Sequence, residues 1–210
     1  MNENNKVLID GEIGADFEFS HEVYGEKFYS SYLKVERKSG VIDDVPIIIS
    51  ERLFDCKHNL TGLLVSVKGV FRSYNKYEGD KRKLVLYVFV KEIEEIDAIA
   101  DFNNVELEGF VCKQPSYRLT PQKREIADMI LAVNRPFGKS DYIPCILWGR
   151  NAKYVSMLQA GAKLKVFGRI QSREYTKIYE DGTMESKIAY ELSVDRFAEL
   201  GDGRIEENRD

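Results

Sequence analysis

LAVNRPFGKSDYIP, residues 131–144, repeats a pattern already present in LKVERKSGVIDDVP, residues 33–46. At one offset of 98 positions the two stretches share Leu33/Leu131, Val35/Val133, Arg37/Arg135, Gly40/Gly138, Asp43/Asp141 and Pro46/Pro144. The match extends on both sides, aligning Val7 and Gly11 with Val105 and Gly109, and aligning Gly62, Gly69 and Ser73 with Gly161, Gly168 and Ser172 after one inserted residue. Self-similarity at a fixed period is typical of a repeated structural unit. The chain is therefore predicted to hold two copies of one domain, residues 1–100 and 103–200, followed by a short acidic tail, residues 201–210.

Each copy reads mainly as β-strands, because β-branched and aromatic residues alternate between Gly, Pro, Asp and Ser signals. In the second copy the expected strands cover 104–112, 126–135, 141–149, 163–177 and 186–197, and a helical pattern closed by Gly161 covers 150–161. In the first copy they cover 7–19, 29–37, 45–50, 63–75 and 83–96, with a short helix around 51–58. This is the order of an oligonucleotide/oligosaccharide-binding (OB) barrel. We predict a mainly all-β chain of two tandem five-stranded OB barrels, each with a short helix after strand 3.

The composition is that of an ordinary globular protein, with 43% hydrophobic and 31% charged residues. No apolar run approaches the ~20 residues that span a bilayer, and the first residues lack the features of a signal peptide. Cys56, Cys112 and Cys145 form no CxxC pair, and neither histidine has metal-like spacing to a cysteine. The motifs HExxH and GxSxG and a glycine-rich phosphate loop do not occur. We expect a cytoplasmic protein without membrane contact, and no enzyme, metal or cofactor.

The net charge of −4 conceals a difference between the two copies. Residues 1–100 carry 14 Lys and Arg against 18 Asp and Glu, whereas residues 101–200 carry 15 against 13. Phosphate binding depends on a basic groove rather than on the total charge. The second copy is therefore the better candidate for contact with nucleic acid.

The only tryptophan of the chain occupies an unusual place in its strand. Side chains two apart share a face of a strand, so Ile143, Cys145 and Leu147 form the obvious core face. Tyr142 and Trp148 then point the other way. A soluble protein places such rings outward when they contact a partner.

Three stretches of the second copy come in a specific order: MILAVNRP (129–136), DYIPCILWGR (141–150) and KLKVFGRIQSREY (163–175). Together they resemble the bacterial single-stranded-DNA-binding protein family across nearly the whole barrel. In that family bases stack on outward aromatics while Arg and Lys follow the phosphate backbone. The resemblance implies stacking on Phe137, Tyr142, Trp148 and Tyr175, and phosphate contacts from Arg135, Arg150, Arg169 and Arg173.

The first copy departs from this pattern at the stacking positions. The residues equivalent to the four aromatics are Ser39, Asp44, Ser50 and Lys76. Arg37 keeps its place, and Arg72 and Tyr74 lie near the fourth strand, so weak backbone contact is all that we expect. The first copy is predicted to act mainly as a scaffold, and the second to do most of the binding.

The expected function is sequence-independent binding and protection of single-stranded DNA in replication, recombination or repair. Two alternatives stay open: an adaptor that uses Trp148 and Tyr142 as a protein-contact anchor, and a binder of single-stranded RNA, because stacking does not distinguish the sugars. A homodimer with four barrels is the expected assembly, and a monomer is its rival. The resemblance also implies a tail with a hydrophobic tip that recruits replication and repair proteins. The sequence closes with ELGDGRIEENRD, which has no apolar tip, so recruitment through a tail is not expected.

Overall fold

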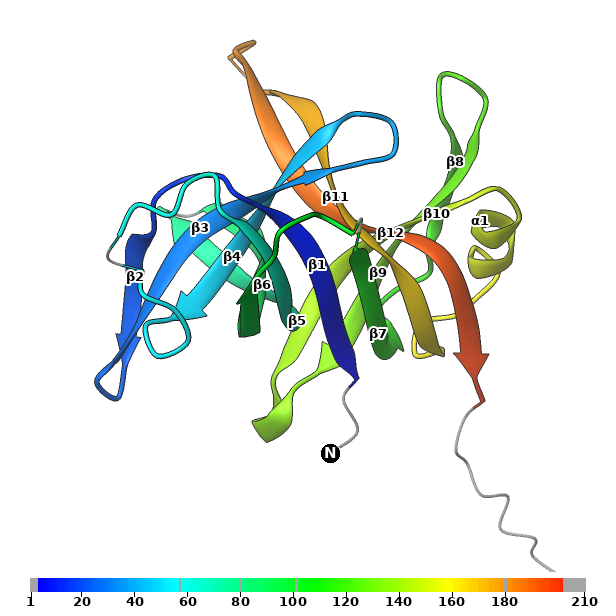
Figure 1. Ribbon diagram of the computed structural model, residues 1–210. Coiled ribbons are helices and arrows are strands. Elements are labelled where there is room, and N and C mark those ends of the chain that lie inside the picture. Colours follow the sequence, from blue (N-terminus) through cyan, green and yellow to red (C-terminus); the bar gives the residue numbers. More distant parts are fainter. Residues whose placement is uncertain (1–3, 57, 80, 101, 180, 202–210) are drawn as a thin grey trace, which may run out of the picture.

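The computed structural model describes residues 4–56, 58–79, 81–100, 102–179 and 181–201 (Figure 1). The strands of the first half are β1 (Asn5–Ile13), β2 (Glu18–Val23), β3 (Glu26–Glu36), β4 (Ile42–Ser50), β5 (Leu64–Glu78) and β6 (Lys81–Glu95). Those of the second half are β7 (Asn103–Val111), β8 (Ser116–Leu119), β9 (Glu125–Asn134), β10 (Ser140–Trp148), β11 (Lys163–Ile178) and β12 (Met184–Leu200). The helical elements are η1 (Pro136–Gly138) and α1 (Gly149–Val155), and no helix in the described ranges has the length and apolar character to cross a bilayer. Residues 202–210, most of the predicted acidic tail, lie outside the described residues.

Five strands of each half pair around a closed circuit. In the first half β1 pairs with β5, β5 with β6, β6 with β4, β4 with β3, and β3 with β1. The second half repeats this order with β7, β11, β12, β10 and β9. Only β4–β6 and β10–β12 run parallel among these pairs of described strands. The pairing is that of an OB barrel, which confirms the predicted mainly β fold. Each half adds an edge strand, β2 or β8, that the prediction did not include.

Alternation along each strand decides which side chains fill the barrels. On β10, Ile143, Cys145 and Leu147 are buried, whereas Tyr142 and Trp148 are exposed. This is the two-residue period of a strand with one face on a core. The core face predicted for this strand from the sequence is therefore confirmed.

Two glycines aligned by the repeat, Gly69 and Gly168, lie where β5 and β11 shift register against their partner strands. A Cβ at Gly69 would lie 2.4 Å from the carbonyl oxygen of Phe89, and one at Gly168 would lie 2.1 Å from that of Ser193. Neither position has room for a side chain, because the partner backbone occupies that space. The sharp bend of each hairpin strand thus requires glycine in both copies.

The helix predicted around residues 51–58 is not formed in the described part of that segment, where the chain makes turns. The hydroxyl of Ser50 accepts a hydrogen bond from the backbone N–H two residues on, at 3.1 Å, which is the bond of a helix N-cap, but no helix follows it in the described residues. In α1 the buried residues Ala152 and Val155 are three apart, which suits a helix. The inward residues of the first half, Phe54 and Cys56, are two apart. The apolar spacing therefore differs between the copies although the chain length is similar.

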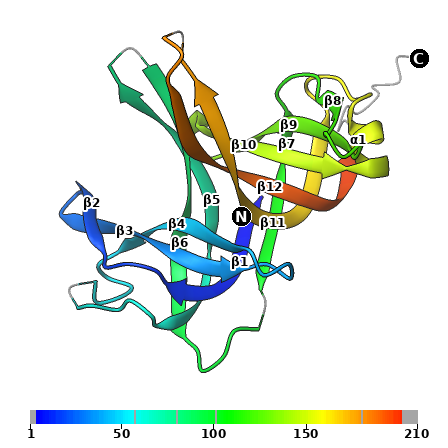
Figure 2. The same cartoon turned by 90° about the horizontal axis from the view of Figure 1, so that it is seen from above.

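The two barrels are joined through backbone pairing. β1 and β7 run antiparallel from Asn5 opposite Leu107 to Ile9 opposite Asn103, so all twelve strands belong to one continuous sheet. Seen from above, the barrels stand side by side with β1 and β7 between them (Figure 2). The two copies of the repeat thus share one continuous sheet.

Two matching polar clusters, which we call the interlock, cross between the halves. One comprises Arg37, Asp43 and Ser172, and the other Arg135, Asp141 and Ser73. In the first cluster Arg37 donates to both oxygens of Asp43, at 2.6 Å each, and to the carbonyl oxygen of Ser172 at 2.6 Å. Ser172 donates to Asp43 through its N–H at 2.7 Å and its hydroxyl at 2.6 Å.

The second cluster repeats these contacts with the two halves exchanged, except that the hydroxyl of Ser73 accepts a hydrogen bond from the backbone N–H of Tyr142. Arg135 donates to both oxygens of Asp141 and to the carbonyl oxygen of Ser73, the latter at 2.9 Å. The N–H of Ser73 donates to Asp141 at 2.6 Å. In each cluster, therefore, one half supplies an Arg–Asp pair and the other half supplies a serine that hydrogen-bonds to it.

The carboxylates of the interlock are fully buried, with exposed fractions of 0% for Asp43 and 1% for Asp141. Burial by itself raises the pKa of Asp43, but hydrogen bonds from Arg37 and Ser172 outweigh it and hold the pKa below its ordinary range. Because the folded pKa is depressed, this contribution to stability is present above about pH 4 and is lost as the pH falls through the folded value. The carboxylate of Asp43 is thus ionised at neutral pH.

We expect Asp43→Asn to lower the free energy of unfolding by about 2–4 kcal/mol, because it leaves a partly buried guanidinium without its charge partner. Urea unfolding followed by circular dichroism measures the change. Glu12→Gln is the control, since it breaks the exposed pair between Glu12 and Lys34 and should have no measurable effect. Equal stability of Asp43→Asn and the unchanged protein would contradict the role given to the interlock.

Candidate nucleic-acid interface

Two large rings project from the outer face of β10. Tyr142 is 47% exposed and Trp148 is 39% exposed, and they stand six residues apart on the same face of the strand. Pro144 and Ile146 lie between them on that face, the first half-buried and the second buried. The result is an apolar strip with an open ring near each end.

β11 adds a third ring and two guanidinium groups. Tyr175 is 37% exposed, and the guanidinium carbon of Arg173 lies 5.8 Å from its ring centre. Nε of Arg173 is 3.7 Å from a carboxylate oxygen of Glu191. Gln171, which shares this face, is buried and donates to Glu191 at 2.8 Å. The outward residues that stay open on this face of β11 are therefore Arg169, Arg173, Tyr175 and Lys177.

The remaining basic groups near this face are weakly engaged. Nη1 of Arg169 lies 3.5 Å from Asp195, and both side chains are about half exposed. Such exposed pairs are worth about 0–1 kcal/mol, so a phosphate can replace the carboxylate. Arg150, in the first turn of α1, is exposed and makes no ion pair with any described residue.

Phe137 stands out from the loop between β9 and β10. Its ring is 99% exposed, and its backbone has φ of +62° in the left-handed region. A bulky non-glycine residue in that region costs about 1–3 kcal/mol, and such strain concentrates at functional sites. Neither the core nor the backbone gains from this ring, which makes contact with a partner the better explanation of it.

Arg37 and Arg135, which the sequence analysis placed among the phosphate contacts, lie in the interlock instead. Each guanidinium holds a buried carboxylate of its own half and a serine carbonyl of the other half. These bonds engage Nε and Nη2 of each guanidinium, and the side chains are only 23% and 21% exposed. The geometry therefore indicates that both arginines stabilise the contact between the two halves.

The outer face of the first half carries its own row of flat groups: His21, Phe28, Phe89 and Arg72. The rings of His21 and Phe28 are stacked, with centres 4.9 Å apart and planes 9° apart. The centres of Phe28 and Phe89 are 5.8 Å apart, and the guanidinium carbon of Arg72 lies 4.7 Å from the centre of Phe89. The first half thus also carries aromatic rings on its outer face.

Sequence reasoning missed this row because it looked for rings only at the positions equivalent to those of β10. In the first half the rings come from β2, β3 and β6. The sequence spacing could have predicted part of this row, since Tyr87 and Phe89 are two apart in a strand and therefore share its outer face. Tyr74, which was singled out, is 45% exposed and meets Tyr87 edge-on at 5.8 Å.

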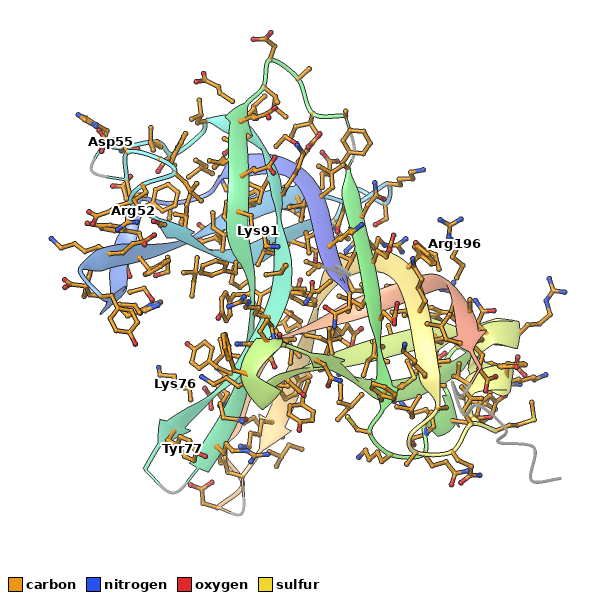
Figure 3. All side chains as sticks on the ribbon, turned by 90° about the horizontal axis from the view of Figure 1, so that it is seen from below. Arg52, Asp55, Lys76, Tyr77, Lys91 and Arg196 are labelled. Carbon is orange, nitrogen blue, oxygen red and sulfur yellow. The ribbon has the colours of Figure 1, made fainter. Side chains whose placement is uncertain are left out.

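The surface has two larger hollows. One, of about 800 Å³, lies across the backs of β1 and β7 and mixes cations with carboxylates. Its charged lining residues are Lys6, Lys68, Lys91, Arg196, Glu92, Glu106 and Asp195; Figure 3 marks Lys91 on the first half and Arg196 on the second. The other hollow, of about 680 Å³, lies between the long hairpins of the two halves. The near balance of charge in the first hollow gives a polyanion little reason to bind there.

Two of the three cysteines, Cys56 and Cys145, are buried among packing residues, whereas Cys112 is exposed. Burial raises the pKa of Cys56 to about 11 and raises the pKa of Cys145 as well, so both thiols stay protonated at neutral pH. Within the described ranges no group of three His, Cys, Asp or Glu side chains is arranged to hold a metal ion. The outer faces of the barrels are therefore the better candidates for a binding site.

Residues 102–199 match the model of the Single-strand binding protein family. Single-stranded DNA-binding protein B of Bacillus subtilis is 38% identical over 81 residues, which cover 35% of this chain and 72% of that protein. The single-stranded DNA-binding protein of Halalkalibacterium halodurans is 39% identical over 80 residues, which cover 35% of this chain and 48% of that protein. The chain spans about half the length of several of the curated relatives that it matches.

The fold is similar to solved structures over nearly the whole chain. The crystal structure of the wild-type single-stranded DNA binding protein from Thermus aquaticus matches with a TM-score of 0.74 at 20% identity, covering 95% of this chain and 94% of that one. A deletion mutant of that protein gives a TM-score of 0.73 over 97% of this chain. At this level of identity the likeness concerns the fold, and it includes both halves.

We expect acrylamide to quench the fluorescence of Trp148 efficiently, because the only tryptophan of the chain is 39% exposed. N-acetyltryptophanamide provides the fully exposed reference. The quenching should be the same at low and high protein concentration. Strong protection that disappears on dilution would show that another copy of the chain covers the ring.

Proposed function

We propose that this chain, which belongs to the single-strand binding protein family, binds single-stranded DNA without sequence preference and protects it during replication, recombination or repair in the cytoplasm. The observation that carries the proposal is the pair of exposed rings, Tyr142 and Trp148, on the outer face of β10. The names of the relatives, each a single-stranded DNA-binding protein, support it. Binding of this kind involves no chemical step.

The proposed contacts follow from what each group can offer. Flat rings accept any base, because every base presents a π face, and each stack is worth about 1–3 kcal/mol. Arginines beside the rings pair with phosphate and can themselves stack. The proposed set consists of Phe137, Tyr142, Trp148 and Tyr175 for bases and Arg150, Arg169 and Arg173 for the backbone. Arg37 and Arg135 are left out of it, because the interlock engages Nε and Nη2 of each and their side chains are mostly buried.

We also propose the division of labour between the halves. Residues 103–200 form the barrel with the main binding face, and residues 1–100 form a second barrel on which Arg72 and Tyr74 lie beside the row of rings. That row supports a larger share for the first half than its loss of rings on β4 implied. Residues 201–210 form the acidic tail.

Fluorescence of Trp148 should fall on titration with an oligothymidine of about 30 nucleotides, long enough for two barrels at up to ~16 nucleotides each. The double variant Trp148→Ala/Tyr142→Ala should lose about 2–6 kcal/mol of binding free energy, measured by anisotropy of a labelled oligomer. Tyr117→Ala is the matched control, because this ring is 40% exposed but lies beside Glu125 and Lys153. It should bind like the unchanged protein.

Two outcomes would overturn the proposal. If the unchanged protein binds no oligothymidine at low salt and Trp148 is shielded, the rings serve contact with a protein and the chain is an adaptor. If a matched oligouridine RNA competes better than the DNA, the chain is an RNA binder.

For assembly we propose a homodimer, which brings together four barrels. The expected mass in solution is twice the 24.2 kDa of one chain, and light scattering coupled to size exclusion measures it. A mass of one chain at every concentration tested would establish the monomer instead.

A further inference from the structure

The continuous sheet of the chain ends in two edge strands, β2 and β8, which lie at opposite ends of the molecule (Figure 1). Among the described strands β2 pairs only with β3, and β8 pairs only with β9. Every residue of both edge strands is exposed. One side of each strand therefore presents backbone N–H and C=O groups that no described strand covers, which makes it a template for pairing with another chain.

The two edges carry opposite charge. Residues 16–27, which we call the acidic edge, contain four carboxylates and one lysine, whereas residues 113–125, which we call the basic edge, contain four cations and one carboxylate. Glu18 and Glu22 of the acidic edge are exposed and pair with no described cation. Lys123 and Arg124 of the basic edge are exposed and pair with no described carboxylate. The acidic edge of one copy therefore attracts the basic edge of another.

The acidic edge also exposes a strained aromatic residue. The turn from β2 to β3 consists of Tyr24 and Gly25, whose φ angles are +50° and +78°. Asn, Asp or Gly is favoured at the first position of such a turn, whereas the tyrosine found there is strained and fully exposed. Phe19 on β2 and Leu119 on β8 are exposed as well. Each edge thus combines apolar side chains with charges, as a contact surface does.

A second copy of the chain explains both edges, whereas other partners explain only one. Nucleic acid could bind the basic edge, but its phosphates would be repelled by Glu18 and Glu22. Charges on edge strands commonly keep copies of a protein apart, but that protection needs edges of the same sign. Here the signs are opposite, so the charges favour contact between copies.

We propose that copies of this chain associate end to end, with the acidic edge of one copy against the basic edge of the next. The contact is heterologous, because it joins two different surfaces, and a row formed in this way can grow at both of its ends. Ion pairs between exposed side chains are weak and are screened by salt. The association therefore adds to the proposed homodimer at high protein concentration and low salt, and it does not depend on the proposed binding of DNA.

The test reverses the charge of one edge at a time. Glu18→Lys/Glu22→Lys makes the acidic edge basic, and Lys123→Glu/Arg124→Glu makes the basic edge acidic. A third variant carries all four substitutions and keeps the net charge of the unchanged protein. Sedimentation velocity measures the mass of each protein over a range of concentrations at low and high salt, without nucleic acid. The mass of the unchanged protein should rise with concentration at low salt and return to its dilute value at high salt.

Each single-edge variant should keep its dilute mass, because its two edges carry charge of the same sign. The variant with four substitutions should gain mass again, and so should an equal mixture of the two single-edge variants, because edges of opposite sign meet once more. A constant mass of the unchanged protein at low salt would overturn the inference. Growth of either single-edge variant alone would also overturn it, as would failure of both the mixture and the variant with four substitutions to gain mass. Equal urea midpoints show that lost association does not come from unfolding.

Discussion

The arrangement of the two barrels depends on a pair of buried carboxylates that neither half can satisfy alone. Asp43 and Asp141 lie in the interior, where an unpaired charge would be expelled, and each is compensated by an arginine of its own half and a serine of the other. Such bonds are directional, so they set an angle as well as a distance. Together with the pairing of β1 and β7, they determine where the two long hairpins stand, and hence whether a cleft exists between them.

The repeat was readable from the sequence because barrels of one kind need glycine, proline and alternating apolar residues at the same places. The same alignment revealed the members of the interlock, since Arg37 and Asp43 have equivalents 98 positions on, and Ser73 has one 99 positions on, after the inserted residue. What it left undetermined was their role. An arginine six residues from an aspartate across a hairpin fits a phosphate contact as well as an ion pair. The serine that decides between the two lies 129 residues from Asp43, and only the packing of the halves brings it there.

For the proposed binding face, the sequence predicted the direction of some rings and missed others. Even spacing placed Tyr142 and Trp148 outward, because a regular strand has a fixed period. The row of His21, Phe28 and Phe89 escaped notice because its members come from three different strands, and strand neighbours are set by topology. The helix expected around residues 51–58 is absent from the described part of that segment for a local reason: the inward residues Phe54 and Cys56 are two apart, which is not the spacing of one face of a helix.

Joining the barrels in one chain also removes a symmetry. In an assembly of identical barrels a twofold axis makes both orientations of a polymer laid across it equivalent, since each end meets the same surface. Here Lys76 of one half stands where the other has Tyr175, and Ser50 where the other has Trp148. A single-stranded DNA lying across both halves would therefore meet a different surface toward each of its ends. Its 5′-to-3′ polarity becomes distinguishable to the protein.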